Sequence, residues 1–466
     1  DEYKNVERGL MCLNRCVEDN YIQGIEGLAN VYFNGELVEE DMNRAKELLE
    51  KAIELGSGNA AYRLGWMYER GFLSEQPDYV KALEYYEKAA SLNNADGYCR
   101  MALYLANGYS GVKDADKSRE CYEKAAELGS CFALVELAFL YENGDGVEKN
   151  YEKAFELISR AAGQGYPYAM FRSGLYMEKG VLGEAKPEEA FAWYTKAAEA
   201  DDNDAIFALG RCYKEGIGTA EDWDKALEWF GKGAEKEESR CLTELGLAYE
   251  NGNGVEENPQ KAVEYMMKAA EQDYVGAQYA LGTLLFRNED SGENDAEAVR
   301  WLERAAELGD IGSQVKLGVC YQDGYNVLEQ GKVCFKEDME KAVELFQNAA
   351  EQGDAEGQFQ LANSYRFGLG VKKDVPKMLY WLRLSAMQGY AEAQYALGIC
   401  YQDGIGVKAD IEKAMDWYER SAAQNYPDAI CSVGMYYLDE EDDVETAKRL
   451  VYKAAQMDCP EAQYLM

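Results

Sequence analysis

The chain has 466 residues, of which 47% are hydrophobic, and it carries a formal net charge of −38. It is too long for one ordinary hydrophobic core, so we expect an array of units. The negative charge argues against nucleic acid and anionic membranes as main partners, because both bind through clustered lysines and arginines. No apolar run approaches the roughly 18 residues that a membrane span needs, so we expect no membrane insertion.

A tyrosine near the end of an expected helix recurs along the chain and defines a repeat. Its positions, filled twice by Leu and once by Met, are Tyr32, Tyr68, Leu105, Tyr141, Met177, Tyr213, Tyr249, Leu285, Tyr321, Tyr365, Tyr401 and Tyr437. Successive positions lie 36 or 37 residues apart, except for one interval of 44 that contains the insertion "LEQGKVCF". A fixed period of this length indicates stacked supersecondary units.

Each unit has the end signals of two helices. In eleven of the twelve units Gly, or once Asn288, stands three residues after the tyrosine and suits the left-handed end of a first helix. We expect the second helix to follow an Asp or Asn cap at Asp41, Asp78, Asp114, Asn150, Asp222, Asn258, Asn294, Asp338, Asp374, Asp410 and Asp443. The exception is Lys186, which Pro187 follows.

The second helix carries two small residues seven positions apart, such as Ala414 and Ser421. Small residues two turns apart let a neighbouring helix approach closely. Neither helix of a pair can bury its apolar face alone, so the pairs are expected to stack into a solenoid.

The two ends of the sequence extend this pattern. We assign residues 1–20 to the second helix of a partial leading repeat, 21–458 to twelve consecutive repeats, and 459–466 to the start of a further first helix. Solenoids normally end in polar capping helices. We therefore expect either that the sequence is a slice of a longer protein or that its end helices pack atypically.

Residues 391–429, "AEAQYALGICYQDGIGVKADIEKAMDWYERSAAQNYPDA", resemble a near-consensus copy of the Sel-one-like repeat, a relative of the tetratricopeptide repeat. The resemblance covers essentially the whole chain. It implies an all-α, right-handed α/α superhelical solenoid of about twelve repeats. It also implies a scaffold that binds a protein or peptide in its concave groove.

In the related tetratricopeptide fold the first helix lines the concave face, so its non-core stripe is the expected binding surface. Aromatic and arginine side chains are the usual anchors of protein interfaces. The expected anchors on or beside this stripe are Tyr62, Trp66, Phe132, Phe139, Phe171, Phe207, Arg211, Arg240, Tyr279, Arg287, Phe359, Arg366 and Tyr395. The alternative is that the rings six residues before the tyrosine pack between the first helices of adjacent pairs.

A local positive patch is a second hypothesis for the middle repeats. Its members are Lys179, Arg211, Lys214, Arg240 and Arg287. On a chain that is otherwise acidic, such a patch would face an acidic segment of the partner, whereas the chain as a whole would attract basic partners.

Enzymatic chemistry has little support in the sequence. The chain has no histidine, the commonest general base, and no regular pair of cysteines for zinc. The "GIGV" strings close helices instead of opening them, which argues against a phosphate cradle. The acidic run 439–443 lacks the ligand spacing of a calcium loop. We therefore expect no enzyme activity, no catalytic residues, no metal and no cofactor.

The leading hypothesis is a non-enzymatic adaptor. One alternative is a secreted or cell-surface factor that engages host proteins, as some members of the resembling family do. Another is a glycan-associated binding protein, because Tyr and Trp also stack on sugars. The twelve cysteines show no regular spacing of the kind that a disulfide ladder requires, which favours the cytoplasm over secretion.

Overall fold

The computed structural model describes residues 2–35, 37–109, 111, 113–287, 292–323, 338–439 and 443–465, without the side chains of 2–6, 287, 292–296 and 439. These residues form 26 α-helices and, within the described ranges, no strand. The all-α fold of repeated helix pairs is thereby confirmed. We denote the first helix of each pair helix A and the second helix B.

Most helices have 13 residues, and the two types alternate along the chain. Helices A are α2 (Ile22–Asn34), α4 (Gly58–Glu69), α6 (Ala95–Asn107), α8 (Cys131–Asn143), α10 (Pro167–Lys179), α12 (Asn203–Glu215), α14 (Ser239–Asn251), α16 (Val275–Arg287), α18 (Ile311–Asp323), α20 (Ala355–Phe367), α22 (Ala391–Asp403) and α24 (Pro427–Asp439). Helices B are α3 (Met42–Glu54), α5 (Tyr79–Ser91), α7 (Ala115–Glu127), α9 (Tyr151–Gly163), α11 (Pro187–Glu199), α13 (Trp223–Glu235), α15 (Pro259–Glu271), α17 (Gly292–Glu307), α19 (Met339–Glu351), α21 (Val375–Met387), α23 (Ile411–Ala423) and α25 (Val444–Gln456). The end helices are α1 (Glu2–Glu18) and α26 (Pro460–Leu465).

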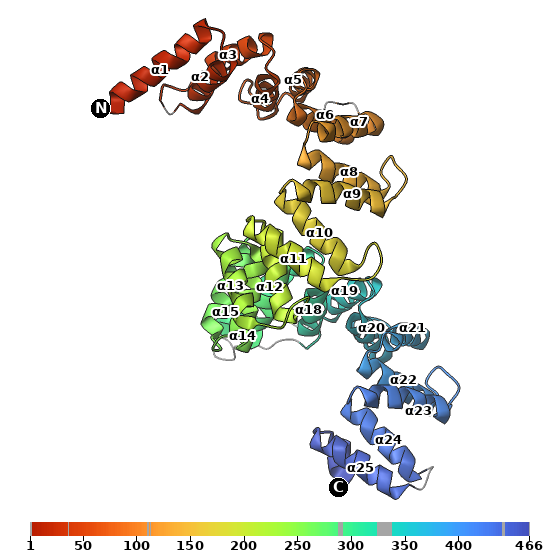
Figure 1. Cartoon of the computed structure of the whole chain (residues 1–466). Helices are drawn as coiled ribbons and strands as arrows, with labels where there is room; N and C mark the ends of the chain where they lie inside the picture. The colour runs from red at the N-terminus through yellow and green to blue at the C-terminus, as the bar shows by residue number, and fades with distance from the viewer. Residues whose placement is uncertain are drawn as a thin grey trace. The chain divides into compact units, whose positions relative to one another are not determined.

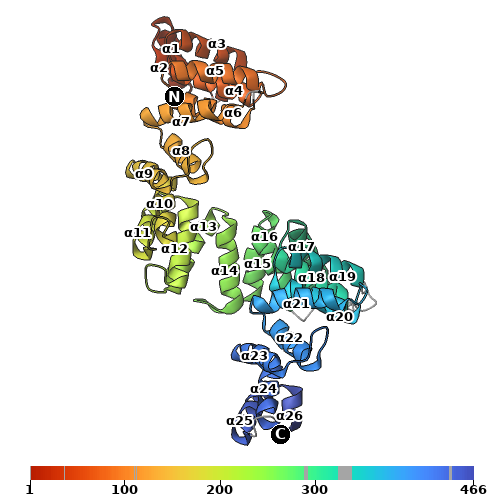
Figure 2. The same ribbon diagram turned by 90° about the vertical axis from the view of Figure 1, so that its right-hand side faces the viewer.

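The chain divides into two compact units, residues 1–229 and 230–466. Within each unit the helices follow one another in sequence order, and each packs against its neighbours in the chain (Figures 1 and 2). Where packing skips one helix, it joins consecutive helices A, as for α4 with α6 and α14 with α16. Packing confined to near neighbours is the defining property of an α-solenoid.

The N-termini of most helices B are capped by the expected Asp or Asn side chains. The side chain of Asp41 accepts a hydrogen bond from the backbone N–H of Arg44 at 2.8 Å. The same cap forms at Asp78, Asp114, Asn150, Asp222, Asn258, Asp338, Asp374, Asp410 and Asp443. The expectation for Asn294 was wrong, because α17 has 16 residues and begins at Gly292. Asn294 therefore lies inside the helix.

Left-handed residues end the helices A. Gly35 and Gly404 have φ values of +66° and +71°, and the backbone N–H of each donates to a carbonyl of the last helical turn. A side chain at such a φ would be strained, which is why glycine recurs there. The predicted ends at Asn288 and Gly324 lie outside the described residues, as do the insertion 328–335 and residues 440–442.

The predicted small residues of helix B lie at the centre of the packing. Ala414 and Ser421 are both fully buried, as are their equivalents in the other units. Helix A approaches this surface through Gly398, where a Cβ atom would come within 2.5 Å of the Tyr418 ring. A glycine on helix A thus makes room for a large ring on helix B.

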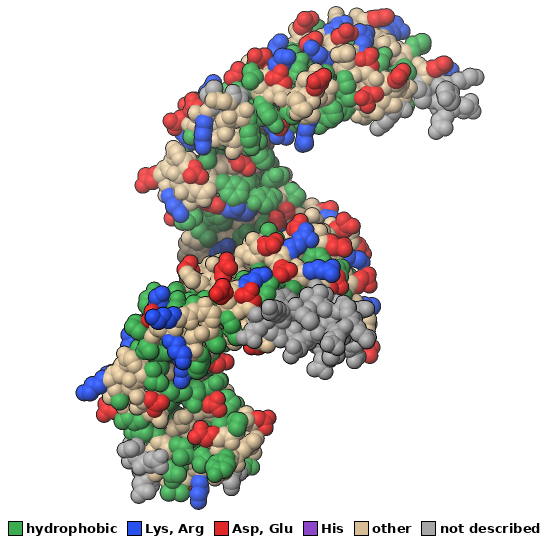
Figure 3. Space-filling view, turned by 180° about the vertical axis from the view of Figure 1, so that it is seen from behind, with side chains coloured by type: hydrophobic (Ala, Val, Ile, Leu, Met, Phe, Trp, Pro, Cys, Tyr) green, Lys and Arg blue, Asp and Glu red, His purple; other side chains and the backbone are tan. Residues whose placement is uncertain are grey.

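Charged side chains cover the remaining surface. Carboxylates and cations are interspersed over the face drawn in Figure 3. Several of them form short-range pairs along helices B, such as Lys268 with Glu264 at 2.9 Å. Exposed pairs of this kind are typically worth only a few tenths of a kcal/mol each, so they solubilise the surface more than they stabilise it.

Candidate protein-interaction surfaces

The predicted anchors lie on helices A, distributed over α4, α8, α10, α12, α14, α16, α20 and α22. Most of them are half-buried. Phe132 and Tyr279 are the more accessible rings, with 41% and 37% of their surface exposed. Arg287 is the last residue of α16, and its side chain lies outside the described residues.

Three of the rings six residues before the tyrosine position pack against helix B of their own repeat. The centroid of the Tyr62 ring lies 5.9 Å from that of Tyr86 on α5. The same contact joins Phe171 to Tyr194 at 5.8 Å and Tyr395 to Tyr418 at 5.5 Å. These rings therefore connect helix A to helix B, and only their outer edges are available to a partner.

Two rings contact a tyrosine at the junction with the next repeat. Phe359 lies 5.4 Å from Tyr390, and Tyr395 lies 5.4 Å from Tyr426, measured between ring centroids. Tyr390 and Tyr426 each precede the next helix A. The aromatic stripe is thus a half-exposed ladder that also stabilises the stacking of repeats.

Trp66 belongs to an aromatic cluster near the N-terminus. Its ring lies 5.7 Å from Phe33 on α2 and 5.3 Å from Phe72 in the loop after α4. Phe72 is 42% exposed, so the cluster presents apolar surface to solvent. Phe139 is covered differently, because the guanidinium of Arg172 stacks 4.4 Å from its ring centroid.

The predicted anchor Arg211 is engaged by its own chain. Its guanidinium forms an ion pair with Glu178 of the preceding helix A at 2.6 Å. Glu178 also accepts a hydrogen bond from the hydroxyl of Tyr194 at 2.6 Å. Burial by itself would raise the pKa of Glu178, but these two donors hold the pKa below its usual value.

The same arrangement recurs at other junctions between helices A. Arg172 pairs with Glu142 at 2.6 Å, and Arg100 lies 3.5 Å from Glu69. Sequence analysis did not identify these pairs. Their spacing in the sequence does indicate them. Each carboxylate directly follows a tyrosine position, and Arg100 and Arg172 each stand five residues before the tyrosine position of the next repeat.

The positive patch expected in the middle repeats contains carboxylates as well. Besides the Arg211–Glu178 pair, the Nε of Arg240 lies 2.6 Å from a carboxylate oxygen of Glu238. Lys179 is exposed beside a pocket of about 250 Å³ that also contains Glu142 and Arg172. These contacts reduce the positive potential of the patch, and its role remains a prediction.

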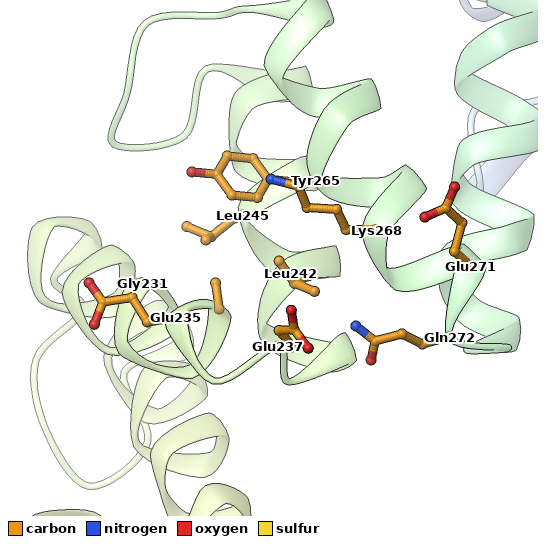
Figure 4. A pocket seen from close by; sticks show the side chains of 10 residues that line it. Gly231, Glu235, Glu237, Leu242, Leu245, Tyr265, Lys268, Glu271 and Gln272 are labelled. Carbon is orange, nitrogen blue, oxygen red and sulfur yellow. The ribbon is translucent and has the colours of Figure 1, made fainter.

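A larger pocket of about 670 Å³ lies in the second unit, among α13, α14 and α15 (Figure 4). Leu242 and Leu245 lie between Glu235 on one side and Glu271 and Gln272 on the other. Its lining residues are Gly231, Ala234, Glu235, Glu237, Leu242, Leu245, Tyr265, Lys268, Glu271 and Gln272. Such an apolar pocket with an acidic rim suits an apolar side chain flanked by basic ones.

Sequence analysis missed this pocket, although α13 carries an indication of it. Gly231 occupies a helix B position at which larger side chains, such as Glu50 and Glu419, occur in other repeats. The missing side chain leaves space beside Leu242. An isolated glycine in a helix does not by itself predict a pocket.

The described residues contain no helix with the length and hydropathy needed to cross a bilayer. Among the same residues, no group of three or more cysteines and carboxylates is arranged to hold a metal ion. The eleven cysteines of the described ranges are free thiols, and most of them are buried.

Stacked helix pairs, glycine-ended helices A and buried small residues on helices B define an α/α solenoid repeat protein. The model of the Sel1 repeat matches eleven segments of the chain: residues 23–57, 58–94, 95–130, 132–166, 167–202, 203–237, 239–274, 275–310, 311–354, 355–390 and 391–426. The chain belongs to the Sel1 repeat family, as its resemblance to the Sel-one-like repeat indicated. The pair α24–α25 follows the last match and has the same organisation.

Among solved structures, the chain is similar to c5321, a protective antigen present in uropathogenic Escherichia coli strains. The two share 30% identity with a TM-score of 0.65, covering 98% of this chain and 96% of that one. A Sel1 repeat protein from Oxalobacter formigenes is also 30% identical, covering 54% of this chain and 96% of that one with a TM-score of 0.47. No curated protein matches the chain.

Proposed function

We propose that this protein is a non-enzymatic interaction scaffold that holds a peptide or a folded protein along its helices A. The observation that supports this function is the half-exposed aromatic ladder, which recurs on several helices A, among them α4, α10, α20 and α22. Tyr62, Phe171 and Tyr395 are fixed by packing against a tyrosine of helix B, so they lose little conformational freedom when a partner binds.

Affinity on this surface comes from the rings rather than from free charge. The guanidinium groups of Arg172 and Arg211 are already bound to carboxylates of the preceding helix A. A partner charge would have to displace those pairs, which costs free energy in partly buried surroundings. Phe132 and Tyr279 present accessible apolar area.

Replacing both accessible rings, Phe132→Ser and Tyr279→Ser, tests the proposal in the full chain. A matched control is Leu128→Ser with Leu308→Ser, because these leucines are 45% and 55% exposed near the ends of helices B. Proteins captured by chemical crosslinking in native lysate are compared by quantitative mass spectrometry. We expect at least one partner to be lost with the ring variant and retained with the leucine control.

Thermal unfolding of both variants establishes that they fold. An unchanged set of crosslinked proteins in the folded ring variant would contradict binding along helices A. Equal loss in both variants would show that general surface hydrophobicity, rather than the ladder, retains the partners.

A second candidate function is that of a factor acting outside the cell on host proteins. It is supported by the similarity to c5321, which is described as a protective antigen. Titration of free thiols in protein isolated from its native source separates the two candidates. Twelve reactive cysteines after unfolding would favour the adaptor, whereas mostly oxidised cysteines would favour the exported factor.

A further inference from the structure

One repeat has the opposite charge to all the others. Residues 355–390 contain five basic residues and two acidic residues, a net charge of +3. The other ten matched repeats each have a net charge between −1 and −5. The positive residues are Arg366, Lys372, Lys373, Lys377 and Arg383.

The outer face of α21 also differs from the other helices B. Tyr380 occupies a position that is Glu or Asp in eight of the other eleven helices B: Glu47, Glu84, Glu120, Glu156, Glu228, Glu264, Glu344 and Asp416. One turn further, Arg383 replaces the Glu419 of α23. Tyr380 and Met387 are 58% and 76% exposed. Apolar and basic side chains thus replace the usual acidic ones.

The basic side chains of this repeat are not neutralised by their own chain. Within the part of the chain that the structure describes, none of the five forms an ion pair. By contrast, the neighbouring repeat pairs Lys413 with Asp410 at 2.7 Å and Arg420 with Asp416 at 2.9 Å. In Figure 3, blue side chains lie beside green ones over the segment that Figure 1 labels α20–α23.

A pocket adjoins the same helix face. It has a volume of about 440 Å³ and lies between α21 and the loop after α22. Its lining residues are Val375, Pro376, Leu379, Tyr380, Arg383, Leu384 and Gly406. The loop reaches α21 closely, because a Cβ on Gly406 would come within 2.4 Å of the Val375 side chain. The pocket is large enough for one apolar side chain of a partner.

We propose that the outer face of α21, with its adjoining pocket, docks an acidic segment of a partner protein that carries an aromatic or aliphatic anchor. The anchor enters the pocket beside Leu379, and carboxylates of the segment pair with Arg383, Lys372 and Lys377. This surface lies on helix B and in the loops, so it is separate from the ladder on helices A.

Electrostatics distinguishes a short acidic peptide from larger polyanions. At physiological ionic strength charges interact over about 8 Å, so a short peptide experiences mainly the positive repeat. A membrane or a nucleic acid would extend over neighbouring repeats, which are all acidic, and would be repelled by them. Charge complementarity therefore favours a protein segment.

A fluorescent peptide of glutamates with two phenylalanines is the direct probe, with anisotropy as the measurement on the full chain. The test variant is Lys372→Glu, Lys377→Glu and Arg383→Glu. The control variant, Lys448→Glu, Arg449→Glu and Lys453→Glu, changes the total charge equally on α25, where all three side chains are exposed. We expect the test variant to bind at least about tenfold more weakly than the wild type, and the control variant to change binding only about twofold.

A second variant, Tyr380→Ser with Met387→Ser, removes apolar surface without changing the charge. It therefore measures the apolar contribution to peptide binding separately. Its matched control is Val444→Ser with Tyr452→Ser on α25, where both side chains are also exposed. We expect only the α21 variant to weaken binding, and we expect a peptide with serines in place of phenylalanines to bind weakly to all forms. Circular dichroism confirms that each variant is folded.

Three results would overturn the proposal. The first is peptide affinity unchanged by the test variant. The second is binding to phosphatidylserine vesicles that exceeds binding to the peptide, which would assign the patch to a membrane. The third is a dimer in analytical ultracentrifugation that the same variant dissociates, which would assign the patch to a second copy of this chain. If the variant Phe132→Ser with Tyr279→Ser loses its partners in lysate, that result concerns the ladder on helices A and does not test this surface.

Discussion

The repeats 355–390 and 391–426 are adjacent and share their internal contacts. In both, a buried serine of helix B donates to the backbone carbonyl of the first residue of helix A: Ser385 to Ala355 and Ser421 to Ala391. In both, a glutamine after helix B donates to a glutamine on helix A, at 2.9 Å for Gln388 and 2.8 Å for Gln424. These hydrogen bonds are the same in the two repeats.

Their exposed residues are different. The first repeat has a net charge of +3 and the second of −3. Tyr380 and Met387 on α21 stand where α23 has Asp416 and Ala423. The comparison teaches that the buried hydrogen bonds of a repeat are kept, whereas exposed positions on helix B are free to specialise for one partner.

The glycine–tyrosine contact should give the largest effect. Gly398→Ala places a Cβ within 2.5 Å of the Tyr418 ring, whereas the first repeat combines Ala362 with Leu382. Overpacking typically costs about 1–3 kcal/mol, only partly offset by the better helix propensity of alanine. We expect faster amide exchange in α22 and α23, measured by hydrogen exchange and mass spectrometry.

The neighbouring repeat supplies the control for this change. Tyr418→Leu combined with Gly398→Ala recreates the Ala362–Leu382 combination, so we expect it to recover most of the lost protection. If Gly398→Ala exchanged like the wild type, the close approach of α22 to α23 would be wrong.

The buried serines should give a smaller and equal effect in both repeats. Ser385→Ala and Ser421→Ala each remove one hydrogen bond to a helix A carbonyl, a loss of about 1 kcal/mol. Amide exchange of α20–α21 and of α22–α23 measures the two effects separately. A change in only one repeat would show that these hydrogen bonds are not equivalent.

The smallest expected effect concerns Asp410. The side chain and the backbone N–H of Lys413 hydrogen-bond its carboxylate, and they lower its pKa below the ordinary value. A depressed pKa contributes stability above the unfolded pKa of about 4, and this contribution is lost as the pH falls through the folded value. NMR titration of labelled aspartates should therefore show a higher Asp410 pKa in Lys413→Ala. An unchanged pKa would exclude the contact.

Much of the fold was predictable from the sequence because stacking repeats the same constraints. Caps such as Asp41 and glycine ends such as Gly404 follow local backbone chemistry, which sequence spacing reveals directly. The buried Ala414 and Ser421 follow from helical periodicity. Only α17 begins earlier than its Asn294 signal indicated.

The interaction surfaces were less predictable because they depend on contacts between repeats. Arg211 was identified as an anchor, but its pairing with Glu178 joins residues 33 positions apart. The pocket beside Gly231 and the face of α21 arise where one repeat departs from the others. A comparison of the net charges of the repeats would have identified the face of α21 from the sequence alone.

Transplanting the exposed residues of one repeat onto its neighbour tests the central claim most directly. Tyr380→Asp, Arg383→Glu and Met387→Ala give α21 the exposed residues of α23, while the hydrogen bonds between α20 and α21 stay unchanged. Isothermal titration with the acidic phenylalanine peptide should give one site in the wild type and none in the transplant. A stoichiometry of one in both proteins, with the transplant folded, would contradict the claim that the exposed helix B residues of α21 determine binding.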